Sequence, residues 1–162
     1  FKAFTHEGGI STPLVVHWPA GGVAGGAIRH GVGHVIDLAA SIEAACGVGH
    51  PTTRGEQPAQ PLSGRSLLPL WRGEASAVYG DDDAIFFEHE DHAALRRGRW
   101  KIVRAKLSED WQLHDISADR TELHDLAAEQ PALLAELVAQ WQALAEQMGV
   151  QPIAEVRAQN LN

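Results

Sequence analysis

The chain has little of several features that mark particular classes of protein. It has one cysteine, Cys46, so no internal disulfide can form, and cysteine usage leaves the compartment unknown. No apolar run approaches the roughly 20 residues of a membrane-spanning helix, so we expect no membrane segment. Basic residues are outnumbered, and the net charge of −8 leaves no basic stripe to neutralise phosphates. A nucleic-acid partner is therefore not expected.

The composition is that of a globular protein. A hydrophobic content of 44% over 162 residues is enough for a core, and the length fits one domain or a small domain plus part of another. The first residue is Phe1, and no basic-then-apolar leader follows it. We therefore expect the chain to be a piece of a longer protein.

The first nineteen residues carry an unusual pattern. Two glycines after Glu7 permit a tight loop, and Pro13 favours an extended chain. The apolar residues Leu14–Trp18 then read as a strand buried on both faces of an α/β sheet. Such a strand needs neighbouring strands, which the rest of the chain does not obviously supply.

The middle of the chain contains a boundary near residues 50–64. Before it, apolar residues at helical spacing predict a helix over residues 34–46 that stops at Gly47. His50–Pro61 is rich in Pro, Thr, Gln and Gly and reads as a connector. A short turn of helix is expected over residues 64–70.

The second half predicts a small antiparallel sheet and a long helix. The strands are expected at Ala84–Glu88, Ala93–Arg97, Trp100–Arg104 and Trp111–Ile116. The helix is expected from Pro131 to Met148, with Gly149 after its end. Its apolar stripe predicts packing against the sheet, although a partner-binding helix is the alternative. The fold class is α/β, locally α+β.

The opening residues resemble a segment of the sulfatase (arylsulfatase) family, which belongs to the alkaline-phosphatase-like superfamily. In that family a Lys-x-x-Thr-x-Glu-Gly-Gly-hydrophobic-x-x-Pro segment brings an active-site lysine to a central strand. The matching residues here are Lys2, Thr5, Glu7, Gly8, Gly9, Ile10 and Pro13.

The second half resembles the same family in order and spacing. Phe87-Glu-His-Glu90 followed by Arg97-Gly-Arg-Trp-Lys101 is similar to a strand and hairpin of bacterial arylsulfatases. Two further signatures follow, over residues 111–116 and 119–126. Within them His114, Arg120 and Asp125 replace the usual tyrosine, proline and asparagine.

The resemblance implies an organisation and an activity. Residues 1–55 would be the C-terminal end of the catalytic α/β domain, and residues 56–162 a C-terminal subdomain with the sheet and helix 131–148. The intact protein would hydrolyse a sulfate ester or sulfated glycan, with an N-terminal sulfatase domain as partner of this portion. The formylglycine nucleophile and the Ca²⁺ ligands of the family would lie upstream, so the chain alone would be inactive.

Few residues of this chain are candidates for the site. Lys2 carries over from the motif as the catalytic residue, its ammonium stabilising charge on the sulfuryl oxygens. His89 and Glu90 are candidate substrate-binding residues, with an ordinary polar strand end as the alternative. Strand alternation would put Glu90 on one face with Glu88 and His92, and no zinc spacing accompanies them, so we expect no metal site in the chain. The basic residues from Arg96 to Lys101 are expected to be solvated.

Two other functions remain open. A related phosphate or phosphonate ester hydrolase would share the sheet and differ in the upstream nucleophile motif. A non-enzymatic binding module built on the sheet and the long helix would expose a large apolar patch.

Overall fold

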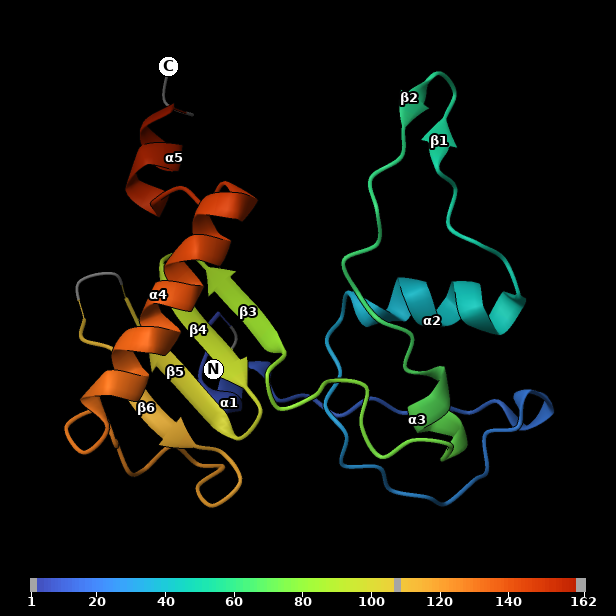
Figure 1. Cartoon of the computed structure of the whole chain (residues 1–162), viewed down its shortest axis with the longest axis horizontal. Helices are drawn as coiled ribbons and strands as arrows, with labels where there is room; N and C mark the ends of the chain where they lie inside the picture. The colour runs from blue at the N-terminus through green and yellow to red at the C-terminus, as the bar shows by residue number, and fades with distance from the viewer. Residues whose placement is uncertain (1–2, 107–108, 160–162) are drawn as a thin grey trace. The chain divides into compact units, whose positions relative to one another are not determined.

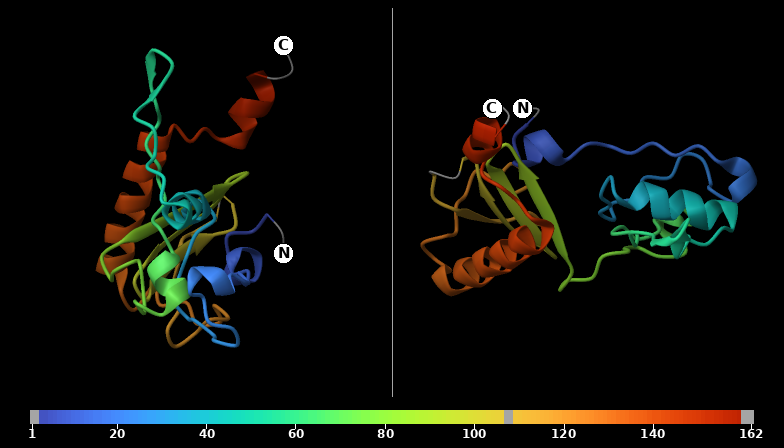
Figure 2. Two further views of the ribbon diagram at one scale, coloured as in Figure 1. Left: turned by 90° about the vertical axis from the view of Figure 1, so that its right-hand side faces the viewer. Right: turned by 90° about the horizontal axis from the view of Figure 1, so that it is seen from above.

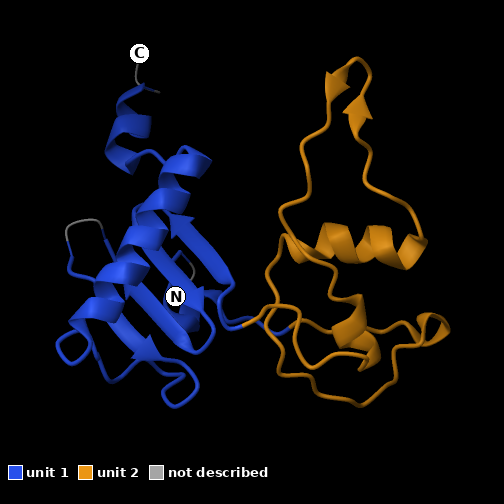
Figure 3. Ribbon diagram, viewed as in Figure 1, with its two compact units in different colours: residues 1–13, 81–162 blue, residues 14–80 orange. Residues whose placement is uncertain are grey.

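The computed structural model describes residues 3–106 and 109–159 (Figure 1). Two compact units are present, one of residues 1–13 and 81–162 and one of residues 14–80 (Figure 3). Their bounds differ from the predicted segments 1–55 and 56–162, and the assignment of residues 1–55 to a catalytic domain stays a prediction. In the described ranges, no helix has the length and apolar character needed to cross a membrane.

The larger unit contains the predicted four-stranded antiparallel sheet. Its strands, in spatial order, are β3 (Ala84–His89), β4 (His92–Arg97), β5 (Trp100–Arg104) and β6 (Gln112–Asp115). Leu95 pairs with Phe86 on one side and Ile102 on the other, and Ile102 pairs with Leu113. Side chains of directly opposed residues point to the same face, so these four form one apolar row across the sheet.

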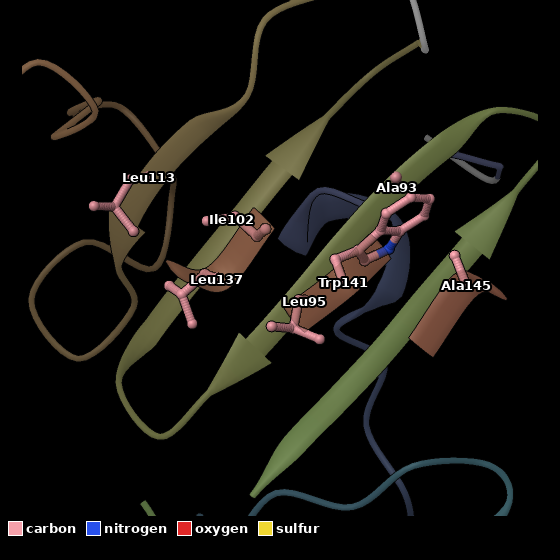
Figure 4. Packing of buried hydrophobic residues seen from close by; sticks show 7 residues of the cluster. All are labelled: Ala93, Leu95, Ile102, Leu113, Leu137, Trp141 and Ala145. Carbon is pink, nitrogen blue, oxygen red and sulfur yellow. The ribbon is translucent and has the colours of Figure 1, made fainter. Parts of the chain in front are cut away.

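Helix α4 (Pro131–Met148) has the predicted bounds. Pro131 stands in its first turn, and Gly149 ends it with a φ of 69°, a conformation that favours glycine. The helix covers one face of the sheet, and Figure 4 shows the core side chains gathered between them. The buried core cluster consists of Ala93, Leu95, Ile102, Leu113, Leu137, Trp141 and Ala145.

The opposite face of the sheet is also covered. Ala94 and Val103 alternate with residues of the core cluster, so they point away from α4, yet both are fully buried. The N-terminal segment with the one-turn helix α1 (Glu7–Ile10) lies on that side (Figure 2). The tight loop predicted at Glu7-Gly8-Gly9 is therefore a helical turn, in which the Gly9 and Ile10 amides donate to the His6 carbonyl.

The predicted strand over Leu14–Trp18 does not form. The segment has no strand hydrogen bonds, and the side chains of Leu14 and Val15 are 53% and 88% exposed. A continuous apolar strand needs neighbours on both sides, and none of the described strands pairs with it. A one-turn 3-10 helix, Pro19–Gly21, follows directly.

The smaller unit has two helices, α2 (Asp37–Cys46) and α3 (Leu68–Arg72). Both were predicted, but α2 begins three residues later than expected and α3 is shifted toward the C-terminus. The predicted connector contains a short hairpin, β1 (Thr53–Arg54) with β2 (Gln57–Pro58). Strands of two residues have no measurable periodicity, which is why the sequence did not reveal them.

Asp37 organises this smaller unit, a role that the sequence analysis missed. The residue is fully buried, and its carboxylate accepts hydrogen bonds from the backbone amides of His34 and Arg65 and from the hydroxyl of Tyr79, at 2.7, 2.8 and 2.6 Å. It therefore ties the start of α2 to chain segments 28 and 42 residues away. Burial lowers the pKa of His34, and the Asp37 charge opposes that shift.

Candidate functional site

The described residues that follow Lys2 are packed against the sheet of the larger unit. Thr5 and Glu7 are only 2% and 8% exposed. The ring of Phe4 lies 4.4 Å from the ring of His92, measured between centroids. Lys2 itself lies outside the described residues, but the motif that contains it is fixed from residue 4 onward.

Three charged residues hold this segment in place. Lys101 Nζ lies 2.9 Å from Glu7 Oε1 and 2.8 Å from Glu122 Oε1. The contact with Glu122 is an ion pair whose geometry is not that of a hydrogen bond. The other oxygen of Glu122 accepts a hydrogen bond from the backbone amide of Glu7 at 2.7 Å. We call Glu7, Lys101 and Glu122 the Glu7 clamp.

The prediction that Lys101 is solvated is wrong. Its side chain is 0% exposed, and those of Glu7 and Glu122 are 9% and 4% exposed. An unpaired ammonium could not be buried in this way, since its desolvation would shift it to the neutral form. Two carboxylates around one ammonium make the burial possible, and they come from the first and the last of the family signatures.

Further basic groups surround the clamp on the same face of the sheet. Arg96 and His114 are the register partners of Lys101 on the two neighbouring strands. Burial lowers the pKa of Arg96, while the charge of Glu7 raises it. Arg120, which stands where the family pattern has proline, donates to Ser11 Oγ at 2.8 Å and lies 3.5 Å from Glu7 Oε2. The segment is thus held at Ser11 as well as at Glu7.

His89 and Glu90 lie together at the turn between β3 and β4, and both are exposed. The predicted alternation is wrong here, because Glu90 and Asp91 form the turn itself, with φ angles of 49° and 71°. Glu90 therefore does not share a strand face with Glu88 and His92. His89 pairs with His92, whose ring contacts Phe4. The chain just after Lys2 and the two candidate substrate-binding residues thus lie at the same end of this hairpin.

A C-terminal helix that the sequence analysis missed meets the same turn. Helix α5 (Ile153–Gln159) starts with the Ile153 amide, which donates to Asp91 Oδ1 at 2.9 Å. Arg157 and Glu90 are 4.0 Å apart, and both are exposed, so this ion pair contributes little. The residues around Glu90 are held mainly by the Asp91 contact.

No group of three His, Cys, Asp or Glu side chains in the described ranges could hold a metal ion. The described residues therefore offer no such group for the Ca²⁺ that the resemblance implies, an ion that needs several oxygen ligands. Cys46 is exposed at the end of α2.

The turn between β6 and α4 is well held, although Asp125 stands where the family pattern has asparagine. Asp125 Oδ1 accepts hydrogen bonds from the amides of Leu113 and Ala127, at 3.0 and 2.9 Å. Asp119 Oδ2 accepts from the amides of Leu123 and His124, both at 2.8 Å. The turn that carries Glu122 of the Glu7 clamp is therefore fixed at both ends.

These contacts predict an acid-sensitive turn. The His124 amide, followed by the Thr121 hydroxyl and the Leu123 amide, lowers the pKa of Asp119 to about 2. Because the pKa of Asp119 is lower in the folded than in the unfolded chain, the ionised carboxylate stabilises the fold. This contribution is fully present above the usual aspartate pKa of about 3.9 and is lost as pH falls toward 2. In carboxyl NMR titrations we expect an Asp119 midpoint near 2. The Leu123 and His124 amide shifts should follow it, and should not in Asp119→Asn; a midpoint at about 3.9 would contradict the geometry.

Comparison with known proteins places these residues in a family. Residues 1–149 match the family described as N-sulphoglucosamine sulphohydrolase, C-terminal. The uncharacterized sulfatase PB10D8.02c of Schizosaccharomyces pombe is 27% identical in an alignment of 160 positions that covers 92% of this chain and 27% of that protein. The chain therefore spans about a quarter of the length of this relative.

Solved structures show the same fold. The crystal structure of Ps i-CgsB is 23% identical, with a TM-score of 0.53 over 67% of this chain and 23% of that chain. The structure of BT4656 in complex with its substrate D-glucosamine-2-N,6-O-disulfate is 20% identical, with a TM-score of 0.53 over 72% and 24% of the two chains. Because the family model covers nearly all of the sequence, the chain belongs to the sulfatase family, in which it matches the C-terminal portion.

Proposed function

We propose that the chain is the C-terminal portion of a sulfuric ester hydrolase, which converts a sulfate ester and water to an alcohol or phenol and sulfate. The family match over residues 1–149 carries this proposal. The matching family is named after N-sulphoglucosamine, and BT4656 was solved with D-glucosamine-2-N,6-O-disulfate. Both names refer to a sulfated glucosamine. These names favour a sulfated sugar, free or within a glycan, over a simple aryl sulfate as the physiological substrate.

Lys2 is the proposed catalytic residue of this portion. Cleavage of a sulfate ester leaves negative charge on the sulfuryl and leaving oxygens, and a compact ammonium placed beside them stabilises the transition state. Such stabilisation requires that the charge be held in position before the reaction starts. The packing of Phe4, Thr5 and Glu7 supports this role, since it fixes the chain that follows Lys2.

His89 and Glu90 are proposed to contact the sugar part of the substrate. An imidazole and a carboxylate offer the donors and acceptors that ring hydroxyls need. Both side chains are exposed, so neither is taken up by the core. Their place at the hairpin end that Phe4 reaches supports a common site with Lys2.

The remaining chemistry is assigned to residues upstream of this chain. Formylglycine would supply the attacking group, and Ca²⁺ would be held by carboxylate and amide oxygens of that part. This division implies that the 162-residue chain alone is inactive.

The test is sulfate release from glucosamine 6-sulfate and from an aryl sulfate. The longer protein should release sulfate from at least one, and the 162-residue chain should release none above a heat-inactivated sample. Turnover by the chain alone would contradict the assignment of the nucleophile. Failure of an active-site-modified, calcium-loaded longer protein on every sulfate ester would contradict the proposed function.

A further inference from the structure

We propose that Lys101 and Glu122 are positioning residues for the proposed catalytic lysine, Lys2, acting through Glu7. This inference rests on the proposed function of Lys2. Neither residue is assigned contact with substrate; both act by fixing the chain segment that carries Lys2 to the sheet of the C-terminal portion.

The Glu7 clamp holds one residue, Glu7, at two points. Lys101 binds the side chain of Glu7, and Glu122 binds its backbone amide. A contact to the side chain alone would leave the backbone free to rotate about it. Two contacts from different elements, β5 and the turn after β6, fix both the position and the direction of the chain at Glu7.

The buried charges of the Glu7 clamp contribute more to a fixed arrangement than to stability. Taking an ammonium and two carboxylates out of water carries a desolvation cost for each ion, so buried ion pairs often add no net stability over apolar residues of the same size. What they do impose is a single arrangement, because any displacement leaves a charge unpaired. A buried cluster of this kind is therefore poorly suited to raising stability and well suited to fixing the register of a functional segment.

Lys2 stands five residues before Glu7 in the sequence. Five residues can span up to about 17 Å, so the clamp alone could not position a side chain so far away. The intervening residues continue the constraint, since Thr5 is buried and the Phe4 ring packs on His92. Ala3 has a φ of 85°, a conformation that is unfavourable for a non-glycine residue and persists where the surroundings impose it. The chain is thus constrained from Glu7 to the residue beside Lys2.

The test compares three variants of the longer protein. Lys101→Met removes the buried ammonium, which leaves Glu122 without its ion-pair partner and Glu7 with only the exposed Arg120, 3.5 Å away. The triple variant Glu7→Met, Lys101→Met, Glu122→Gln removes all the charges while its glutamine can still accept from the residue-7 amide. Lys106→Met is the matched control, since Lys106 is exposed and lies just after β5, the strand that contains Lys101. Measurements are kcat, KM, melting temperature and amide exchange at Gly9, Ile10 and Ser11.

We expect Lys101→Met to lower kcat by about thirtyfold to a hundredfold, the range caused by a displacement of about 1 Å, with KM within about twofold. The triple variant should regain most of the melting temperature while kcat stays at least about tenfold low. Lys106→Met should match the wild type. A triple variant with wild-type kcat, or a kcat that follows only the folded fraction, would overturn the proposal.

Amide exchange separates this proposal from the proposed function. In the 162-residue chain, Lys101→Met should speed exchange at Gly9, Ile10 and Ser11 at least about tenfold more than at Leu137 in α4. Unchanged exchange would overturn the positioning role even where Lys2→Ala abolishes sulfate release. Faster exchange in Lys101→Met, together with a longer protein that hydrolyses no sulfate ester, would refute the proposed sulfatase activity. The positioning role depends on that activity and would fall with it. The clamp would then serve only to attach the segment around Glu7 to the sheet.

Discussion

Replacing Lys2 by alanine in the longer protein is expected to lower kcat for sulfate ester hydrolysis about a hundredfold. Losing one well-placed charge contact in a closed site removes on the order of 3 kcal/mol of transition-state stabilisation, which corresponds to that factor in rate. KM should change less than kcat, because the contact strengthens as charge develops. Steady-state kinetics on a chromogenic aryl sulfate measures both constants.

The controls separate charge from geometry and from folding. Lys2→Arg keeps the charge but should also be impaired, since the wider guanidinium does not fit a site shaped for an ammonium. Lys106→Ala makes the same change at an exposed lysine and should leave kcat and the melting temperature unchanged. Near-normal kcat in Lys2→Ala would show that the motif match had assigned the wrong lysine.

Trp141→Ala is expected to destabilise the larger unit by about 3–5 kcal/mol, the usual loss for removing a buried tryptophan. The side chain is 5% exposed and packs on Phe86 and Trp111, both with centroids 5.4 Å away. Its indole N–H donates to the Phe87 carbonyl at 3.2 Å, so truncation also removes this part-buried hydrogen bond. Urea unfolding of the 162-residue chain, followed by far-UV circular dichroism, measures the free-energy change.

Two further variants define the origin of that loss. Trp141→Phe keeps an aromatic ring and removes the indole donor, so it should be less destabilising than Trp141→Ala. Gln142→Ala lies on the exposed side of the same helix and should change stability by less than about 0.5 kcal/mol. If Trp141→Ala were as mild as Gln142→Ala, the packing of α4 on the sheet would be wrong.

The sheet and α4 could be predicted because each element carries its own local signal. Pro131 and Gly149 mark the ends of the helix, and its apolar stripe has helical spacing over five turns. The strands are separated by turn residues such as Gly98, whose φ of 56° favours glycine. These signals act within a few residues of each other and do not depend on distant contacts.

The Glu7 clamp could not be predicted in the same way. Lys101 and Glu7 are 94 residues apart in the chain, and nothing local pairs them. One signal was present: Ala93-Ala94-Leu95 and Ile102-Val103 are continuous apolar runs, which are typical of strands covered on both faces. If both faces of the sheet are covered, the side chain of Lys101 must point at a covered face and needs buried partners of opposite charge.

Leu14–Trp18 shows the opposite failure. Its composition predicts a strand, but strand formation depends on neighbours that supply hydrogen bonds, and the described strands are all paired elsewhere.

The candidate site residues could be picked out from the sequence, but their arrangement could not. His89 and Glu90 were singled out from sequence order, yet only the register of β3 with β4 and the contact of Phe4 with His92 bring them to one end of the hairpin.

The most direct test of the sulfatase assignment compares two esters that share one leaving group. The longer protein is given p-nitrophenyl sulfate and p-nitrophenyl phenylphosphonate, and kcat/KM is measured for each ester with the wild type and with Lys2→Ala. We expect the sulfate ester to be the better substrate and Lys2→Ala to remove most of its turnover. Preferred hydrolysis of the phosphonate ester, unaffected by Lys2→Ala, would contradict the sulfatase assignment.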